Sequence, residues 1–120
     1  MSNTIAFLDG NFDEEFKLSN RAFEYGDGIF ESIIGYRRQI QFWENHYRRL
    51  VEGCKALSME LPDDFSSEFL KYIILELAQK NQFEEFFRVK INVWRQTGGL
   101  YTHTTNKIHY LIRLYAYKPQ

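Results

Sequence analysis

The 120-residue sequence is poor in cysteine and contains no long hydrophobic run. Cys54 is its one cysteine, which excludes a disulfide within the chain and suits a reducing compartment. No apolar stretch reaches the roughly 20 residues that span a membrane, and Met1 to Thr4 lack the basic region and apolar run of a signal peptide. We therefore expect a cytoplasmic protein with no membrane partner.

An excess of charge of one sign is also absent, because 15 basic residues stand against 16 acidic ones. A net charge of −1 gives no electrostatic reason to expect nucleic acid as a partner. His103 and His109 have no ligand spacing to a cysteine or a carboxylate, so we expect no metal site. Against these absences stand 44% hydrophobic and 18% aromatic residues, which predict one domain with a real core.

The hydrophobic pattern predicts short strands first, then two helices, then two longer strands. The alternation in residues 29–36 places Phe30 on one face of its strand and Glu31 on the other. Residues 18–25 are expected to be connecting structure. The pattern predicts an α+β fold, an antiparallel sheet of about five to six strands covered by two helices. The expected strands are 5–8, 12–16, 29–36, 40–43, 86–95 and 107–117, and the expected helices run from about 44 to 57, with Asn45 as the N-cap, and from about 62 to 81.

Two segments carry the strongest functional signal. The first is Arg21-Ala22-Phe23-Glu24-Tyr25-Gly26-Asp27-Gly28-Ile29-Phe30-Glu31, and the second is His46-Tyr47-Arg48-Arg49-Leu50. An arginine near the start of a helix beside a sheet can bind a phosphate with two nitrogens. The spacing alone leaves open a solvated Arg48–Arg49 pair, of which only one side chain points inward, since neighbours differ by about 100° around a helix.

Together the two segments resemble the start of the fold-type IV, or class IV, pyridoxal-phosphate enzymes. This family includes branched-chain aminotransferases, D-amino-acid transaminases and 4-amino-4-deoxychorismate lyases, and its small N-terminal domain has the expected fold. The resemblance implies that Arg49 holds the phosphate of pyridoxal phosphate, while His46 is a packing or hydrogen-bonding residue. It also implies that Tyr25 and Phe30 line the substrate pocket, although Phe30 could equally be a core residue.

A third segment, from Lys90 to Asn106, resembles the part of this family that contacts the substrate carboxylate. The resemblance implies substrate-binding roles for Lys90 and Arg95, while an exposed strand lysine is the ordinary alternative for Lys90. The lyases have Arg-Gly-x-Gly-Gly-Arg, whereas this chain has Arg95-Gln96-Thr97-Gly98-Gly99-Leu100. The loss of the second arginine favours an aminotransferase over a lyase.

The resemblance covers only the small domain of these enzymes. It implies residues 1–117 as that domain and 118–120 as the start of a linker to a larger domain that carries the Schiff-base lysine. None of the lysines present matches that lysine, so we expect the 120-residue chain alone to be inactive. In the full-length enzyme, expected to be a homodimer, the reaction would be amino-group transfer between an amino acid and a 2-oxo acid. A 4-amino-4-deoxychorismate lyase and a non-enzymatic partner-binding module are the alternatives.

Overall fold

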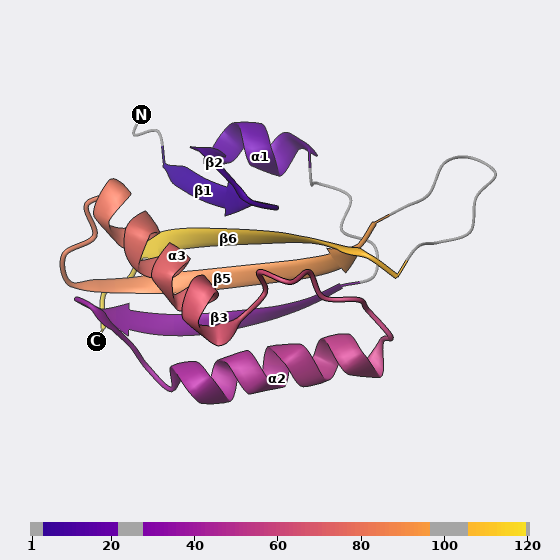
Figure 1. Ribbon diagram of the computed structural model, residues 1–120. Coiled ribbons are helices and arrows are strands. Elements are labelled where there is room, and N and C mark those ends of the chain that lie inside the picture. The colour runs from indigo at the N-terminus through magenta and orange to yellow at the C-terminus, as the bar shows by residue number, and fades with distance from the viewer. Residues whose placement is uncertain (1–3, 22–27, 97–105, 120) are drawn as a thin grey trace.

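The protein is described by a computed structural model that covers residues 4–21, 28–96 and 106–119. Six strands form one sheet in the order β2-β1-β6-β5-β3-β4, in which every pair of neighbours is antiparallel (Figure 1). This confirms the α+β prediction. The strands are β1 (Ile5–Leu8), β2 (Asn11–Glu14), β3 (Gly28–Tyr36), β4 (Gln39–Ile40), β5 (Phe86–Arg95) and β6 (Ile108–Ala116).

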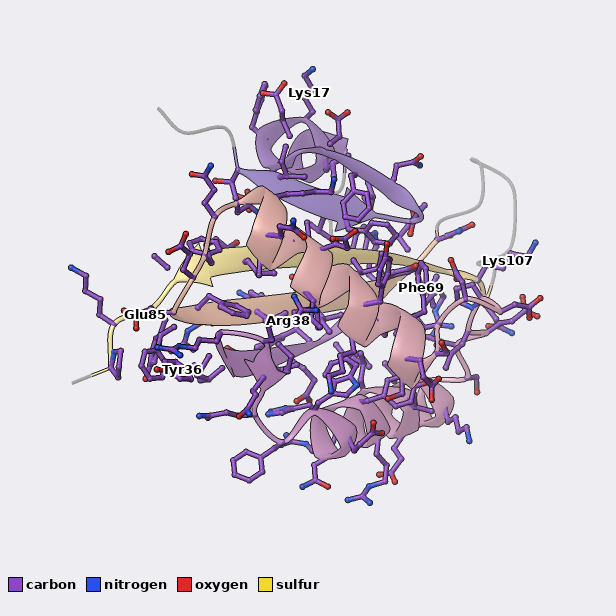
Figure 2. The ribbon with its side chains drawn as sticks, turned by 60° about the vertical axis from the view of Figure 1, so that its left-hand side comes forward. Lys17, Tyr36, Arg38, Phe69, Glu85 and Lys107 are labelled. Atoms are coloured by element: carbon purple, nitrogen blue, oxygen red, sulfur yellow. The ribbon has the colours of Figure 1, made fainter. Side chains whose placement is uncertain are left out.

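Two helices, α2 (Trp43–Ala56) and α3 (Ser67–Lys80), cover one face of the sheet (Figure 1). Alternation in β5 sends its odd-numbered apolar residues towards these helices, where they are almost fully buried. Phe69 of α3 (labelled in Figure 2) meets Phe7 of β1 edge to face, with ring centroids 6.1 Å apart. The core is therefore one layer between the sheet and these two helices.

Polar contacts fix how the helices are placed. Trp43 Nε1 donates to Ser67 Oγ at 3.0 Å and so ties the start of α2 to the start of α3. At the other end of α3, the Asn81 side chain accepts from Ile5 N at 2.7 Å and donates to Ile5 O at 2.9 Å. These bonds satisfy the backbone N–H and C=O of Ile5, because β6 pairs with β1 only from Phe7 onwards.

The opposite face of the sheet is partly covered by a helix that the sequence did not predict. Residues expected to finish a strand and to form a connection instead make α1 (Glu15–Arg21), and β2 ends at Glu14. Leu18 is the buried anchor of α1 and packs on a second small cluster. Seven residues with one buried anchor carry too little periodicity to indicate a helix. The cluster contains Ala6, Leu8, Leu18, Trp94 and Leu111.

Three boundaries also differ from the expected ones. Strand β4 has only two residues, because Phe42 adopts a left-handed conformation with φ of 54° and starts α2 at Trp43. Asn45, the expected cap, therefore lies inside that helix. Helix α3 begins at Ser67 rather than near Pro62, because Ser66 Oγ accepts from Phe69 N at 3.1 Å and caps it. Among the described residues, no helix is long and apolar enough to cross a membrane.

Candidate functional site

Arg49 lies on the side of α2 that faces β3, beside the largely covered carboxylate of Glu31. Its Nε is 3.8 Å from Glu31 Oε2, and His46 Nδ1 is 2.7 Å from Glu31 Oε1. The Glu31 side chain is only 11% exposed, whereas that of Arg49 is 70% exposed. His46 and Arg49 are three residues apart on one helix, which places them side by side over Glu31.

The neighbouring arginine takes a different direction. Arg48 is exposed and donates through Nη2 to Asn45 Oδ1 at 3.2 Å, within its own helix. The sequence predicted that only one of the two arginines would point towards the sheet, and the structure confirms that it is Arg49. His46 also has the hydrogen-bonding place that was expected for it near the helix start.

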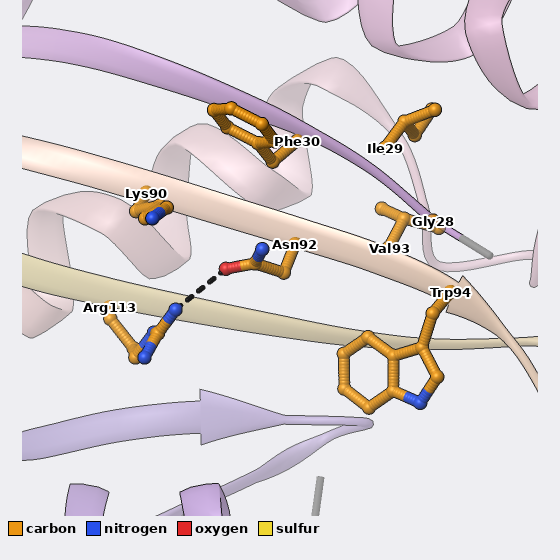
Figure 3. A pocket seen from close by; sticks show the side chains of 8 residues that line it. All are labelled: Gly28, Ile29, Phe30, Lys90, Asn92, Val93, Trp94 and Arg113. Atoms are coloured by element: carbon orange, nitrogen blue, oxygen red, sulfur yellow. Dashed lines mark hydrogen bonds between the residues drawn. The ribbon is translucent and has the colours of Figure 1, made fainter. Parts of the chain in front are cut away.

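A cavity of about 300 Å³ lies on the other face of the sheet, beside the same strand (Figure 3). Phe30 projects into it and is 60% exposed, so it forms a wall of this cavity and is not part of the core. Gly28 also belongs to the lining, and a Cβ there would lie 2.6 Å from Val93 O, so the close backbone approach needs glycine. The lining residues are Gly28, Ile29, Phe30, Lys90, Asn92, Val93, Trp94 and Arg113.

Two cations meet in this cavity from adjacent strands. Lys90 of β5 and Arg113 of β6 are direct partners in the strand register, so their side chains leave the sheet next to each other on one face. Lys90 Nζ lies 5.2 Å from the centroid of the Phe30 ring, in the range of a cation–π contact. Like charges placed opposite each other repel, which makes the cavity attractive to an anion.

Arg113 has hydrogen-bonding capacity to spare. Its Nη2 donates to Asn92 Oδ1 at 2.8 Å (Figure 3), while its Nε is buried and has no partner among the described residues. Burial raises the pKa of the nearby Glu15 carboxyl, and the positive charge of Arg113 opposes that shift. Glu15 Oε1 likewise finds no partner in the described part of the chain, so Glu15 does not saturate the guanidinium.

The other residues expected at the site lie elsewhere or outside the described ranges. Arg95 is on the helix-covered side of β5, where it donates to Leu57 O at 2.8 Å and to Asn106 Oδ1 at 3.3 Å. The structure therefore does not bring Arg95 beside Lys90, and its substrate-binding role stays a prediction. Tyr25 and the Gly98-Gly99 loop fall outside the described residues.

The lining residues that were not among the predicted site residues include Asn92, Trp94 and Arg113. Asn92 and Trp94 share the strand and the face of Lys90, so alternation could have indicated them. Arg113 lies 23 positions after Lys90 in the sequence, and only the register of β6 against β5 makes them neighbours. A sequence pattern carries no signal for that register.

The two halves of the candidate site are joined by the edge of β3. Phe30 and Glu31 are consecutive residues whose side chains leave opposite faces of this strand, towards the cavity and towards Arg49. Strand β4 pairs only with the last two residues of β3, so residues 28–33 carry no second partner strand in the described part of the chain. This edge of β3 therefore separates the cavity on one face from Arg49 on the other.

Comparison with known proteins decides which family has this arrangement. The sequence model of the family described as amino-transferase class IV matches residues 28–120, which include Phe30, Arg49 and Lys90.

The chain belongs to the class IV aminotransferase family.

Individual members of the family resemble the chain over part of their own length. A probable branched-chain-amino-acid aminotransferase of Aquifex aeolicus is 35% identical over 94 residues, which are 70% of this chain and 30% of that protein. An aminodeoxychorismate lyase of Vibrio harveyi is 29% identical over 83 residues, or 68% of this chain and 28% of the lyase. The chain thus spans about a third of the length of these class IV relatives.

A solved structure supports the fold. The branched-chain aminotransferase of Thermoproteus uzoniensis with norvaline superposes on 98% of this chain and 42% of its own, with a TM-score of 0.74 and 19% identity. This likeness confirms the class IV fold.

Proposed function

We propose that this chain is the small, ligand-binding domain of a pyridoxal-phosphate-dependent aminotransferase. The observation that carries the proposal is the pairing of two features across the edge of β3. On one side Arg49 lies beside Glu31 with its side chain exposed, and on the other a cavity combines an aromatic wall with two cations. A phosphorylated cofactor with an amino-acid substrate needs one phosphate site and one carboxylate site, and the two features match those needs.

Arg49 fits the phosphate of the cofactor. Glu31 approaches it through Nε, and the described residues offer no hydrogen-bond partner to its two terminal nitrogens. A guanidinium with its fork free binds a phosphate with two parallel hydrogen bonds. The exposure of the side chain gives the phosphate access without any rearrangement of the sheet.

The cavity fits a substrate. Phe30 excludes water from one side, and Lys90 with Arg113 attracts the carboxylate that every amino acid and 2-oxo acid carries. When bound, pyridoxal phosphate supplies the electron sink that amino-group transfer needs. The family resemblance adds Tyr25 and Arg95 to the proposed substrate contacts.

We place residues 1–117 in the small domain and residues 118–120 at the start of a linker to a second domain that carries the cofactor-binding lysine. The share of about 30% that the chain covers in the Aquifex relative supports this division. A homodimer is proposed as well, supported by exposed aromatic side chains such as Phe42, which is 73% exposed. The buried, unpaired Cys54 supports a cytoplasmic location. Sequencing the reading frame beyond Gln120 tests the division, and a stop codon there would overturn it.

The test of the proposed function is the loss of cofactor affinity in Arg49→Ala, made in the protein encoded by the complete reading frame. Removing one charge-assisted contact costs about 1.5–3 kcal/mol, which corresponds to about 10–150-fold weaker binding of pyridoxal phosphate. Arg48→Ala is the matched control, because Arg48 points away from Glu31, and it should leave the affinity within about twofold. Equal effects of the two substitutions would refute the assignment of Arg49.

A second candidate is a 4-amino-4-deoxychorismate lyase, favoured by the Vibrio harveyi relative and by Gly98-Gly99 in the sequence. Leu100 stands where the lyase pattern has its second arginine, which favours the aminotransferase. The two reactions give different products. Release of pyruvate from aminodeoxychorismate without a 2-oxo acid would establish the lyase, whereas transfer of an amino group to a 2-oxo acid would establish the aminotransferase.

A further inference from the structure

Glu31 uses both of its oxygens on α2. Oε1 accepts from His46 Nδ1 at 2.7 Å, and Oε2 faces Arg49 Nε at 3.8 Å. Because an ionised carboxylate can only accept a hydrogen bond, this contact requires the tautomer of His46 with a hydrogen on Nδ1. The carboxylate is thus held on one side by the histidine and turned towards the arginine on the other.

This geometry selects which part of the guanidinium is left for a ligand. A carboxylate that bound the two terminal nitrogens of Arg49 would occupy the fork that a phosphate needs. Glu31 instead lies nearest Nε, at the base of the group, and the two terminal nitrogens have no hydrogen-bond partner among the described residues. The 70% exposure of Arg49 over the 11% exposure of Glu31 agrees with a guanidinium that is anchored from below.

The packing distance between α2 and β3 is set by a contact close to Glu31, His46 and Arg49. A Cβ on Gly53 of α2 would lie 2.9 Å from Ile29 Cδ1, so the helix packs tightly on the strand. Ile29 and Glu31 leave the same face of β3, two residues apart. The close approach at Gly53 therefore holds Glu31 within reach of Arg49, one turn earlier on the helix, and of His46, two turns earlier.

We propose that Glu31 is a positioning residue that orients Arg49 for a phosphate, with His46 holding the carboxylate in place. The inference rests on the proposed function, because it requires Arg49 to bind the phosphate. A positioning role and simple charge repulsion predict opposite changes in phosphate affinity when the charge of Glu31 is removed. Glu31 has the same sign as a phosphate, so removing its charge would tighten phosphate binding if repulsion were its only effect. A positioning role requires that binding weakens.

The experiment measures the affinity of the protein from the complete reading frame for pyridoxamine 5′-phosphate and for pyridoxamine. These two probes differ only in the phosphate, and neither carries the aldehyde that would react with a lysine. We expect Glu31→Gln to weaken binding of the phosphorylated probe by about 3–10-fold, the size of one net hydrogen bond. Binding of pyridoxamine should stay within about twofold.

Glu31→Asp separates position from charge. It keeps the negative charge but withdraws the carboxylate by one methylene, so a positioning role predicts a loss similar to that of Glu31→Gln. Glu76→Gln on α3 makes the same change of net charge away from the cluster and should have no effect on either probe. Thermal melts of each variant show that the fold is retained, and Glu31→Gln retains an acceptor for His46.

An Arg49→Ala background completes the test. There the additional loss from Glu31→Gln should vanish, because Glu31 acts through Arg49. Tighter binding in Glu31→Gln, an equal loss for both probes, or an undiminished loss in the Arg49→Ala background would each overturn the positioning role. If Arg49→Ala itself leaves the affinity for the phosphorylated probe unchanged, it is the proposed phosphate site that fails.

Discussion

Replacing Gly35 with alanine should destabilise the strand that carries both halves of the site. Gly35 pairs directly with Phe87 across β3 and β5. A Cβ at Gly35 would overlap Cζ and Cε2 of the Phe87 ring. Phe87 is completely buried, and its ring stacks on that of Phe83 with centroids 6.2 Å apart. The ring therefore has no open space into which it can move.

The magnitude follows from two opposing terms. Overpacking a well-packed core costs about 1–3 kcal/mol, and the smaller entropy of the unfolded alanine chain returns about 0.4–1 kcal/mol. We expect a net loss of about 1–2 kcal/mol in the free energy of unfolding. For a chain of this length, an unfolding entropy of about 2.1 cal/mol/K per residue converts each kcal/mol into about 4 °C, so the melting temperature should fall by about 4–8 °C.

Urea denaturation followed by far-ultraviolet circular dichroism measures this loss. A double-mutant cycle with Phe87→Leu provides the control, because the smaller side chain makes room for the new methyl group. The cost of Gly35→Ala should then be much reduced in the Phe87→Leu background. A free energy of unfolding that is unchanged or raised by Gly35→Ala would refute the steric reasoning, as would an equal cost in both backgrounds.

Three further outcomes are expected. Asn81→Ala removes two bonds to Ile5 and one to Leu77 O at 2.9 Å, and should lower the free energy of unfolding by about 1–3 kcal/mol; a loss below about 0.5 kcal/mol in urea melts would contradict this. Burial raises the pKa of the Cys54 thiol to about 11 from 9.0, so at pH 8 iodoacetamide should alkylate the folded protein at least about 100-fold more slowly than the unfolded one. Equal rates would exclude that shift. Arg113→Gln should weaken binding of a monocarboxylate such as valerate by about tenfold in an NMR titration, which is the effect of losing one charged hydrogen bond. The melting temperature should fall by no more than about 2 °C, because Lys90 loses a neighbour that repels it. Unchanged affinity would remove Arg113 from the cavity's anion-binding residues.

Much of the local structure could be predicted because its signal is local. Alternation in residues 29–36 correctly placed Phe30 and Glu31 on opposite faces. Helical spacing correctly indicated that only one of Arg48 and Arg49 faces the sheet, and the family resemblance selected Arg49. Helix α1 and the true start of α3 were missed, since one depends on a single buried anchor and the other on the side chain of Ser66. Whether Phe30 belonged to the core or to a pocket could not be decided, because alternation gives the face of a strand but not what covers that face.

By itself, the sequence determined the family and the faces on which the functional residues lie, because both follow from short motifs and from the periods of strands and helices. Only the tertiary structure decided which distant residues meet. The pairing of Lys90 with Arg113 depends on the register of β5 against β6, and the anchoring of Arg49 on Glu31 depends on how closely α2 packs on β3. Register and helix docking are set by packing over the whole core, so no single segment of the sequence records them.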